Sequence, residues 1–327
     1  MLEFLTNDSW LNPQFDYLLF LQNLRMHIGP VFDEFFMWIS QFGEIEIPLL
    51  FICLIYWCFD FKSGVYLFSL NGLGLFIAQF FKMTACVYRP WVLNDSIKPV
   101  DAAFKNAGGY SFPSGHSQLA ASSWGGMAFL IAKKHKILSA LIILGVLLVG
   151  FSRNYLGVHT LQDVVCGLSI GFILIFAVNS LINWCENSKD RYILFASVID
   201  ILIVLFVWYV LFKNYPMDYV NGKLLVNPDK AISNSIIYAG WISGVINGVC
   251  LCSKFFPYDP KSASKKARSI RGVAGMILAL LILPLVQYTF DNDVPHLMSF
   301  ILMFGVGFVL TAAYPFIFTM VEKYRQG

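Results

Sequence analysis

Long apolar runs are the feature that most restricts what this chain can fold into. Nine segments are apolar enough to form helices in a lipid bilayer, whose hydrocarbon core is about 30 Å thick. They lie at 43–60, 62–83, 116–132, 137–152, 162–184, 191–212, 232–253, 272–289 and 296–320. Charged residues make up only 13% of the 327 residues, against about 25% in soluble domains. The sequence therefore predicts an all-α polytopic membrane helix bundle with about nine transmembrane helices.

The segment before the first run has a different pattern. In VFDEFFMWISQF, residues 31–42, apolar side chains recur with a helical period and leave a polar opposite face. This pattern favours an amphipathic helix in the membrane interface, and the alternative is a further short span. The predicted parts of the chain are thus an N-terminal interfacial segment at 1–42, a core at 43–213 and additional C-terminal transmembrane helices at 214–327.

The basic residues predict the orientation of the chain in the membrane. Most lysines and arginines of the loops fall on one side, including KKHK at 133–136 and KSASKKARSIR at 261–271. The positive-inside rule makes that side cytoplasmic, so the loops at 84–115 and 153–161 are expected on the extracytoplasmic side. The net charge of only +3 argues against a nucleic-acid partner. Membrane lipids are the expected surroundings.

Three polar stretches fall at the predicted extracytoplasmic ends of the spans. They are FKMTACVYRPWV at 81–92, PSGH at 113–116 and SRNYLGVHTLQD at 152–163. Their candidate site residues are Lys82, Arg89, Ser114, Gly115, His116, Arg153, His159 and Asp163. Because the three stretches face the same side of the predicted topology, we expect these side chains to meet in one site.

This set of side chains suits the binding of a phosphoryl group. Three cations can neutralise its oxygens, and an arginine can do so with two hydrogen bonds at once. The backbone N–H groups that open the helix after Ser114 favour anions. His159 is followed four residues later by Asp163, close enough on a helix for the carboxylate to hold one imidazole nitrogen. The sequence has no acidic cluster for magnesium, so neither a metal nor a cofactor is expected.

Together the stretches resemble the signature motifs of the type-2 phosphatidic acid phosphatase superfamily, in the order K-x6-RP, PSGH and SR-x5-H-x3-D. Lipid phosphate phosphatases, glucose-6-phosphatases and vanadium haloperoxidases share these motifs, and the resemblance covers about residues 62–184. It implies that His159 is a nucleophile that forms a phosphohistidine, that Asp163 orients it, and that His116 protonates the leaving oxygen. It also implies that the phosphate is held by Lys82, Arg89, Ser114, Gly115 and Arg153.

The resemblance implies a metal-independent phosphatase with a phosphatase core at 43–213. We expect it to act on a lipid phosphate monoester or diphosphate at the extracytoplasmic face of a bacterial inner membrane. A span count near nine resembles the glucose-6-phosphatase branch, so a soluble phosphomonoester is the alternative substrate. A non-enzymatic alternative is a catalytically inactive member that binds or flips lipid.

Two further features of the predicted spans need an explanation. Gly240, Gly244 and Gly248 form a face of small residues that favours close helix packing, within the chain or in a homodimer. Asp200 stands in the middle of a span, where a carboxylate is costly unless it is paired or protonated. It is expected either to form an interhelical hydrogen bond or to contact a substrate or a proton.

Overall fold

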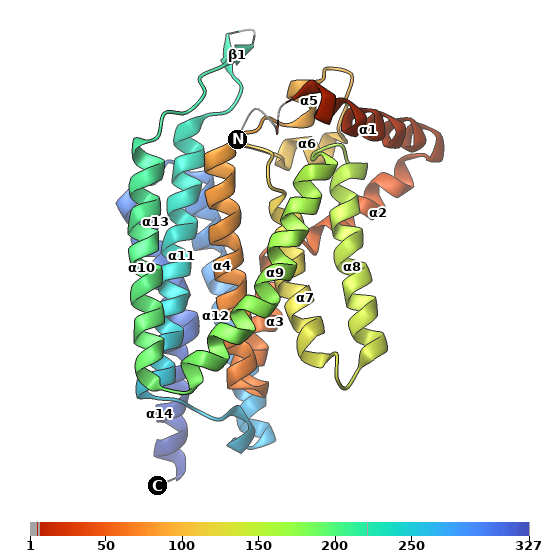
Figure 1. Ribbon diagram of the computed structural model, residues 1–327. Helices are drawn as coiled ribbons and strands as arrows, with labels where there is room; N and C mark the ends of the chain where they lie inside the picture. The colour runs from red at the N-terminus through yellow and green to blue at the C-terminus, as the bar shows by residue number, and fades with distance from the viewer. Residues whose placement is uncertain (1–4, 6, 221, 327) are drawn as a thin grey trace. The chain divides into compact units, whose positions relative to one another are not determined.

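A computed structural model describes residues 5, 7–220 and 222–326, and this part of the chain is mostly helical (Figure 1). The helices are α1 Asp8–Ile28, α2 Pro30–Gln41, α3 Glu46–Leu54, α4 Phe61–Ala85, α5 Pro90–Leu93, α6 Asp101–Asn106, α7 Gly115–Ile131, α8 Lys136–Tyr155, α9 Leu161–Glu186, α10 Lys189–Phe212, α11 Pro228–Phe255, α12 Lys265–Asp291, α13 His296–Phe308 and α14 Tyr314–Gln326. Two short strands, β1 Tyr219–Val220 and β2 Lys223–Leu224, pair antiparallel. A π-helical turn, Ile55–Phe59, continues α3, and another, Val309–Ala313, joins α13 to α14.

The prediction of an all-α membrane bundle is confirmed, but the count of about nine spans is not. Among the described residues, seven helical segments are long and apolar enough to cross a membrane, or up to eight if the bent pair α2 and α3 is one span. Helix α7 has 17 residues, which at about 1.5 Å per residue is slightly shorter than a hydrocarbon core of about 30 Å. The predicted span at 43–60 is the second half of the bent pair.

Contacts group the chain into two compact units. The first comprises Met1–Ile47, Ile77–Ile175 and Lys213–Ile232, and the second Pro48–Phe76, Phe176–Phe212 and Ser233–Gly327. Each unit therefore joins parts that are distant in the sequence. The predicted division of the chain at residues 42 and 213 is a division by sequence order and stays a prediction.

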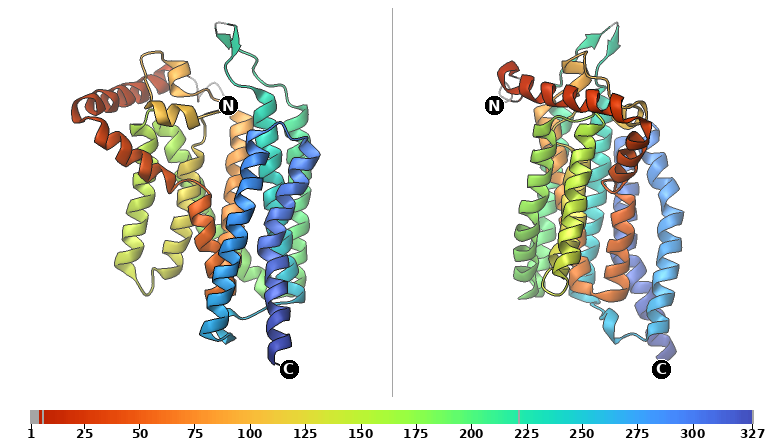
Figure 2. Two further views of the ribbon diagram at one scale, coloured as in Figure 1. Left: turned by 180° about the vertical axis from the view of Figure 1, so that it is seen from behind. Right: turned by 90° about the vertical axis from the view of Figure 1, so that its right-hand side faces the viewer.

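In the first unit α7 and α8 form an antiparallel hairpin, and α1 lies across one end of it (Figures 1 and 2). Helices α1 and α2 both contact α8. The two are separated by Gly29, whose φ of 87° makes the turn between them. Apolar side chains of α1, among them Leu11 and Phe15, pack against Ile97 in the loop after α5. Helix α2 covers the predicted amphipathic stretch, whose depth in the membrane stays a prediction.

In the second unit the small residues of α11 allow a close approach to α13. A Cβ atom at Gly240 would lie 2.4 Å from the backbone oxygen of Phe300, and one at Gly244 would lie 2.1 Å from that of Phe304. Both positions therefore require glycine. Of the two expectations for this face, packing within the chain is the one that the structure contains.

Candidate active site

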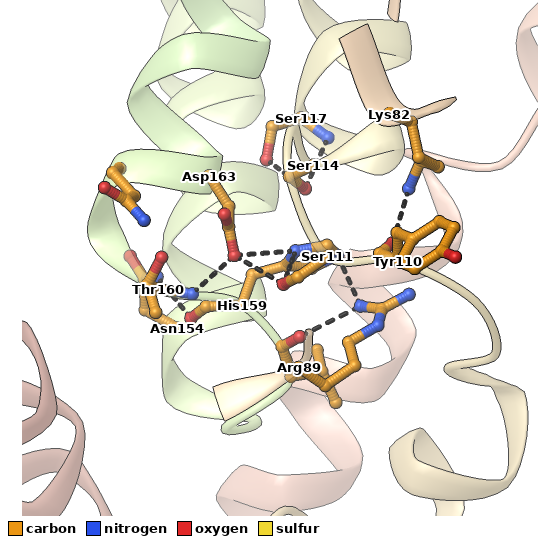
Figure 3. Close-up of polar contacts among 12 residues, drawn as sticks. Lys82, Arg89, Tyr110, Ser111, Ser114, Ser117, Asn154, His159, Thr160 and Asp163 are labelled. Carbon is orange, nitrogen blue, oxygen red and sulfur yellow. Dashed lines mark hydrogen bonds and ion pairs between the residues drawn. The ribbon is translucent and has the colours of Figure 1, made fainter. Parts of the chain in front are cut away.

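His159 lies in the loop between α8 and α9, and only 2% of it is exposed. Its Nδ1 is 3.3 Å from Oδ2 of Asp163 in the first turn of α9 (Figure 3). Asn154, near the end of α8, donates from Nδ2 to the backbone oxygen of His159 over 2.9 Å. Burial and then the charge of Arg89 lower the pKa of His159 well below its usual value, so the ring is neutral at neutral pH.

The carboxylate of Asp163 is fully buried and has two donors on one oxygen. Ser111 donates from Oγ to Oδ2 over 2.6 Å, and the backbone N–H of Thr160 donates to the same atom over 2.9 Å (Figure 3). The backbone oxygen of Asp163 accepts from the N–H of Ser114 over 2.9 Å. This last hydrogen bond joins the first turn of α9 to the start of α7. Two of the three polar stretches are therefore held next to each other.

Arg89, just before α5, connects the site to two loops. Its Nη1 lies 2.8 Å from Nε2 of His159. The guanidinium also donates to three backbone oxygens: from Nη1 to Val158 over 2.9 Å, from Nη2 to Gly108 over 2.8 Å and from Nε to Gly109 over 3.3 Å. Because every nitrogen of this buried side chain has a partner, its position is well defined.

The other two predicted cations also lie near His159. Lys82, in the last turn of α4, donates from Nζ to the backbone oxygen of Tyr110 over 3.0 Å. Arg153, in the last turn of α8, donates from Nη1 to Oγ of Ser40, while its buried Nε has no hydrogen-bond partner in the described part of the chain. The charges of both act on His159. A buried cation with an unused donor is suited to receive an oxygen of an anion.

The start of α7 supplies backbone donors. Ser114 caps this helix, since its Oγ accepts from the N–H of Ser117 over 3.4 Å. The N–H of Ser114 itself is occupied by Asp163, so the groups left for an anion are those of Gly115 and His116. A Cβ atom at Gly115 would meet nothing within 4 Å. The space beside the α-carbon of Gly115 is therefore open.

The structure adds contacts that the three motifs do not indicate. Ser111 stands two residues before Pro113. Its hydroxyl, next to the PSGH stretch, is the sequence feature from which a role at the site could have been predicted. Two of these contacts come from the end of α2 and the turn after it. They are Ser40, which accepts from Arg153, and Glu44, whose Oε1 is 3.7 Å from Nε2 of His116. Only the packing of α2 on α8 brings them to the site, and nothing in the local sequence indicates it.

The arrangement offers a neutral imidazole with a carboxylate behind it, three cations, a helix N-terminus and a second histidine. Within the ranges that the structure describes, no group of three or more His, Cys, Asp or Glu side chains is placed to hold a metal ion. A tetrahedral anion could be bound here and attacked by the nitrogen of a histidine.

The chain is similar to known proteins. A family model described as PAP2 superfamily matches residues 63–186, and one described as PAP2 superfamily phosphatase, transmembrane extension, matches residues 236–326. Phosphatidylglycerophosphatase B of Bacillus subtilis (strain 168) is 32% identical over 173 residues, which are 50% of this chain and 81% of that protein. A crystal structure of a transmembrane PAP2 type phosphatidylglycerolphosphate phosphatase from Bacillus subtilis is 24% identical with a TM-score of 0.45, and the match covers 53% of this chain and 86% of that one. The first match includes all three polar stretches.

Proposed function

Because this chain belongs to the PAP2 superfamily and is an integral membrane phosphatase of that family, we propose that it hydrolyses a lipid phosphate through a phosphohistidine on His159. The observation that carries the proposal is the buried pair of His159 and Asp163, 3.3 Å apart, with three cations around it. A neutral imidazole held by a carboxylate is a nucleophile, and the cations neutralise the phosphoryl oxygens.

The reaction proceeds in two displacements. In the first, Nε2 of His159 attacks phosphorus while the bond to the leaving oxygen breaks, and His116 gives that oxygen a proton. Asp163 stabilises the positive charge that develops on the ring of His159. The phosphoryl oxygens are held by Lys82, Arg89 and Arg153 and by the N–H groups at the start of α7.

The second displacement releases inorganic phosphate. His116 takes a proton from a water molecule as the water oxygen attacks phosphorus, and the bond from phosphorus to Nε2 of His159 breaks. The nucleophile returns to its neutral form and His116 is protonated again. Each histidine thus has one role in each half-reaction, and no metal ion or cofactor takes part.

The substrate is proposed to be a lipid monoester or diphosphate, and phosphatidylglycerol phosphate is the first candidate because the similar Bacillus subtilis protein is named for it. The alternative substrate is a soluble phosphomonoester. The non-enzymatic alternative is a catalytically inactive protein that binds or flips lipid. The filled motif positions favour an enzyme, because each side chain that the mechanism uses is present.

The site is proposed to face the extracytoplasmic side of a bacterial inner membrane. The support is the distribution of basic residues, since the stretches at 133–136 and 261–271 lie on the opposite side of the predicted topology from the three motifs. A homodimer also stays a proposal.

The test is a comparison of substrates with the purified protein in detergent. Phosphate release is measured from phosphatidylglycerol phosphate, phosphatidic acid, a polyprenyl diphosphate and glucose 6-phosphate. We expect a lipid phosphate to be the best substrate, with inhibition by vanadate and no loss of activity in a chelator. If phosphate were released fastest from glucose 6-phosphate, the soluble phosphomonoester would be the favoured substrate. If no phosphate were released from any of the four compounds, the non-enzymatic alternative would be favoured.

The mechanism is tested by His159→Ala, which should lower turnover by at least about a thousandfold while the protein elutes as the folded wild type does. His27→Ala is the matched control. His27 is exposed in the last turn of α1, where its Nδ1 lies 2.7 Å from the backbone oxygen of Asn23. Unchanged turnover in His159→Ala would remove the proposed nucleophile.

A further inference from the structure

The turn between α2 and α3 packs directly on His116. A Cβ atom at Gly43 would lie 2.8 Å from Cβ of His116, 2.9 Å from its backbone oxygen and 2.9 Å from Cγ1 of Val149. No side chain fits at this position without displacing α7 or α8. The glycine therefore allows the N-terminal part of the chain to reach the histidine that the mechanism uses as its acid.

Two polar side chains of this region contact the site. Ser40 accepts a hydrogen bond from Nη1 of Arg153. Oε1 of Glu44 is 3.7 Å from Nε2 of His116, the distance of an ion pair when the imidazole is protonated. The side chain of His116 is 28% exposed and that of Glu44 is 48% exposed, so the pair lies at the water-accessible edge of the site, unlike the buried pair of His159 and Asp163.

We propose that Glu44 is a positioning residue for the proposed general acid, and that its carboxylate, 3.7 Å from Nε2 of His116, orients the ring and favours its protonated form. This inference rests on the proposed function and adds to it a residue that lies outside the three motifs. When the leaving group departs, His116 gives its proton to that oxygen and becomes neutral. In the second displacement it takes one proton from the attacking water, and the imidazolium beside Glu44 is restored.

The charges around His116 explain why a carboxylate is needed there. Burial first, and then the charges of Arg153 from α8 and Arg89 from the segment before α5, disfavour a positive charge on His116. His159, from the loop after α8, is the other titratable group that faces it. Glu44 opposes these groups, because a nearby negative charge favours the protonated imidazole. Without it, His116 would lose its proton at a lower pH.

The experiment compares Glu44→Gln with wild type on two substrates across pH. Glu46→Gln is the matched control, because Glu46 is also exposed and lies at the start of α3. In Glu44→Gln the alkaline limb of kcat should move to lower pH by about 0.5–1 unit. At a pH above the limb, turnover of the lipid phosphate should fall about three- to tenfold. Glu44→Asp, which keeps the charge, should retain most of the wild-type profile.

The second substrate, p-nitrophenyl phosphate, separates proton donation from a structural effect. Its phenolate leaving group depends less on a general acid than the alkoxide of a lipid, so its turnover by Glu44→Gln should change less than about twofold. Equal losses on both substrates without a shift of the alkaline limb, or a Glu44→Gln profile identical to wild type, would overturn the proposal. Failure of the proposed function is visible separately, as wild-type protein that hydrolyses neither substrate, and that result overturns this proposal as well.

Discussion

Nη1 of Arg89 lies 2.8 Å from Nε2 of His159, and this contact determines which imidazole nitrogen carries the proton. An arginine side chain only donates hydrogen bonds, so Nε2 accepts. The proton of the neutral ring is then on Nδ1, which faces Oδ2 of Asp163 at 3.3 Å. The lone pair that attacks phosphorus in the proposed mechanism therefore accepts a hydrogen bond from Arg89 in the structure. This hydrogen bond has to open before a phosphoryl group can reach Nε2.

The first prediction concerns the acid side of the pH profile. Burial, and then the charge of Arg89, lower the pKa of His159, so the ring gains a proton only at a pH below the ordinary histidine value of about 6.5. For the free enzyme, the acid limb of kcat/KM should therefore lie below that pH. It is measured from about pH 4 to about pH 9, with the ionisation of the substrate determined separately by phosphorus NMR. An acid limb centred at or above about 6.5 would show that His159 is not held neutral.

The second prediction is that Ser111 contributes to turnover although it lies outside the motifs. Its Oγ is 2.6 Å from Oδ2 of Asp163 and 3.3 Å from Nδ1 of His159. A hydrogen bond to a charged group contributes about 1.5–3 kcal/mol, so Ser111→Ala should lower kcat about tenfold or more. KM should change little, because Ser111 contacts the proposed catalytic pair, His159 and Asp163, and not the expected phosphate-binding groups.

The control for Ser111 is Ser122→Ala. Ser122 is also fully buried, and its hydroxyl donates to the backbone oxygen of Gln118 within α7. Steady-state kinetics of both variants are compared at one pH. Similar kcat values for the two would mean that the contact of Ser111 with Asp163 does not support catalysis.

The third prediction concerns α1, which contacts the first turn of α9 directly after the loop that carries the proposed nucleophile. Gln14, 8% exposed, accepts at Oε1 from the N–H of Gln162 over 2.8 Å, and Trp10 donates from Nε1 to Oε1 of Gln162 over 2.6 Å. That N–H is in the first turn of α9, where no intrahelical acceptor exists. Gln14→Ala should lower the free energy of unfolding by about 1 kcal/mol. It should also lower kcat several-fold, because Asp163 is the next residue.

Thermal unfolding and kcat of Gln14→Ala are measured in the same detergent, with Gln41→Ala at the exposed end of α2 as the control. A lower Tm with unchanged kcat would show that α1 stabilises the fold without positioning Asp163.

The membrane architecture, and the proximity of the side chains in the three polar stretches, could be predicted because they depend on local properties of the sequence. Apolar length identifies helices whatever their neighbours are. The spacing of His159 and Asp163 follows from the helical period, and the structure places these side chains together. The gathering of Lys82, Arg89 and Arg153 near His159 follows from their position at one end of the predicted spans.

The remaining features depend on tertiary packing. Ser40 and Glu44 reach the site only because α2 packs on α8. Polar residues are common at helix ends, so the sequence around these two does not indicate a role at the site. The count of spans differs because α2 and α3 are bent by 40° relative to each other and because α7 has only 17 residues. Hydropathy reveals neither feature. The N–H of Ser114 is occupied by Asp163, so only the fold shows which donors remain for an anion.

The last prediction is that Asp200 is structural. In α10 its Oδ1 accepts from Oγ of Ser243 over 2.7 Å, and Nδ2 of Asn247 lies 2.9 Å from its Oδ2, both partners being in α11. This is the expected interhelical hydrogen bond. It lies in the second unit, whereas His159 and Asp163, the proposed catalytic pair, lie in the first. Asp200→Ala should lower the free energy of unfolding by about 1–2 kcal/mol, measured by thermal unfolding in detergent. Turnover per folded molecule should be unchanged. If Asp200→Asn kept the wild-type Tm but lost turnover, Asp200 would instead be a contact for substrate or for a proton.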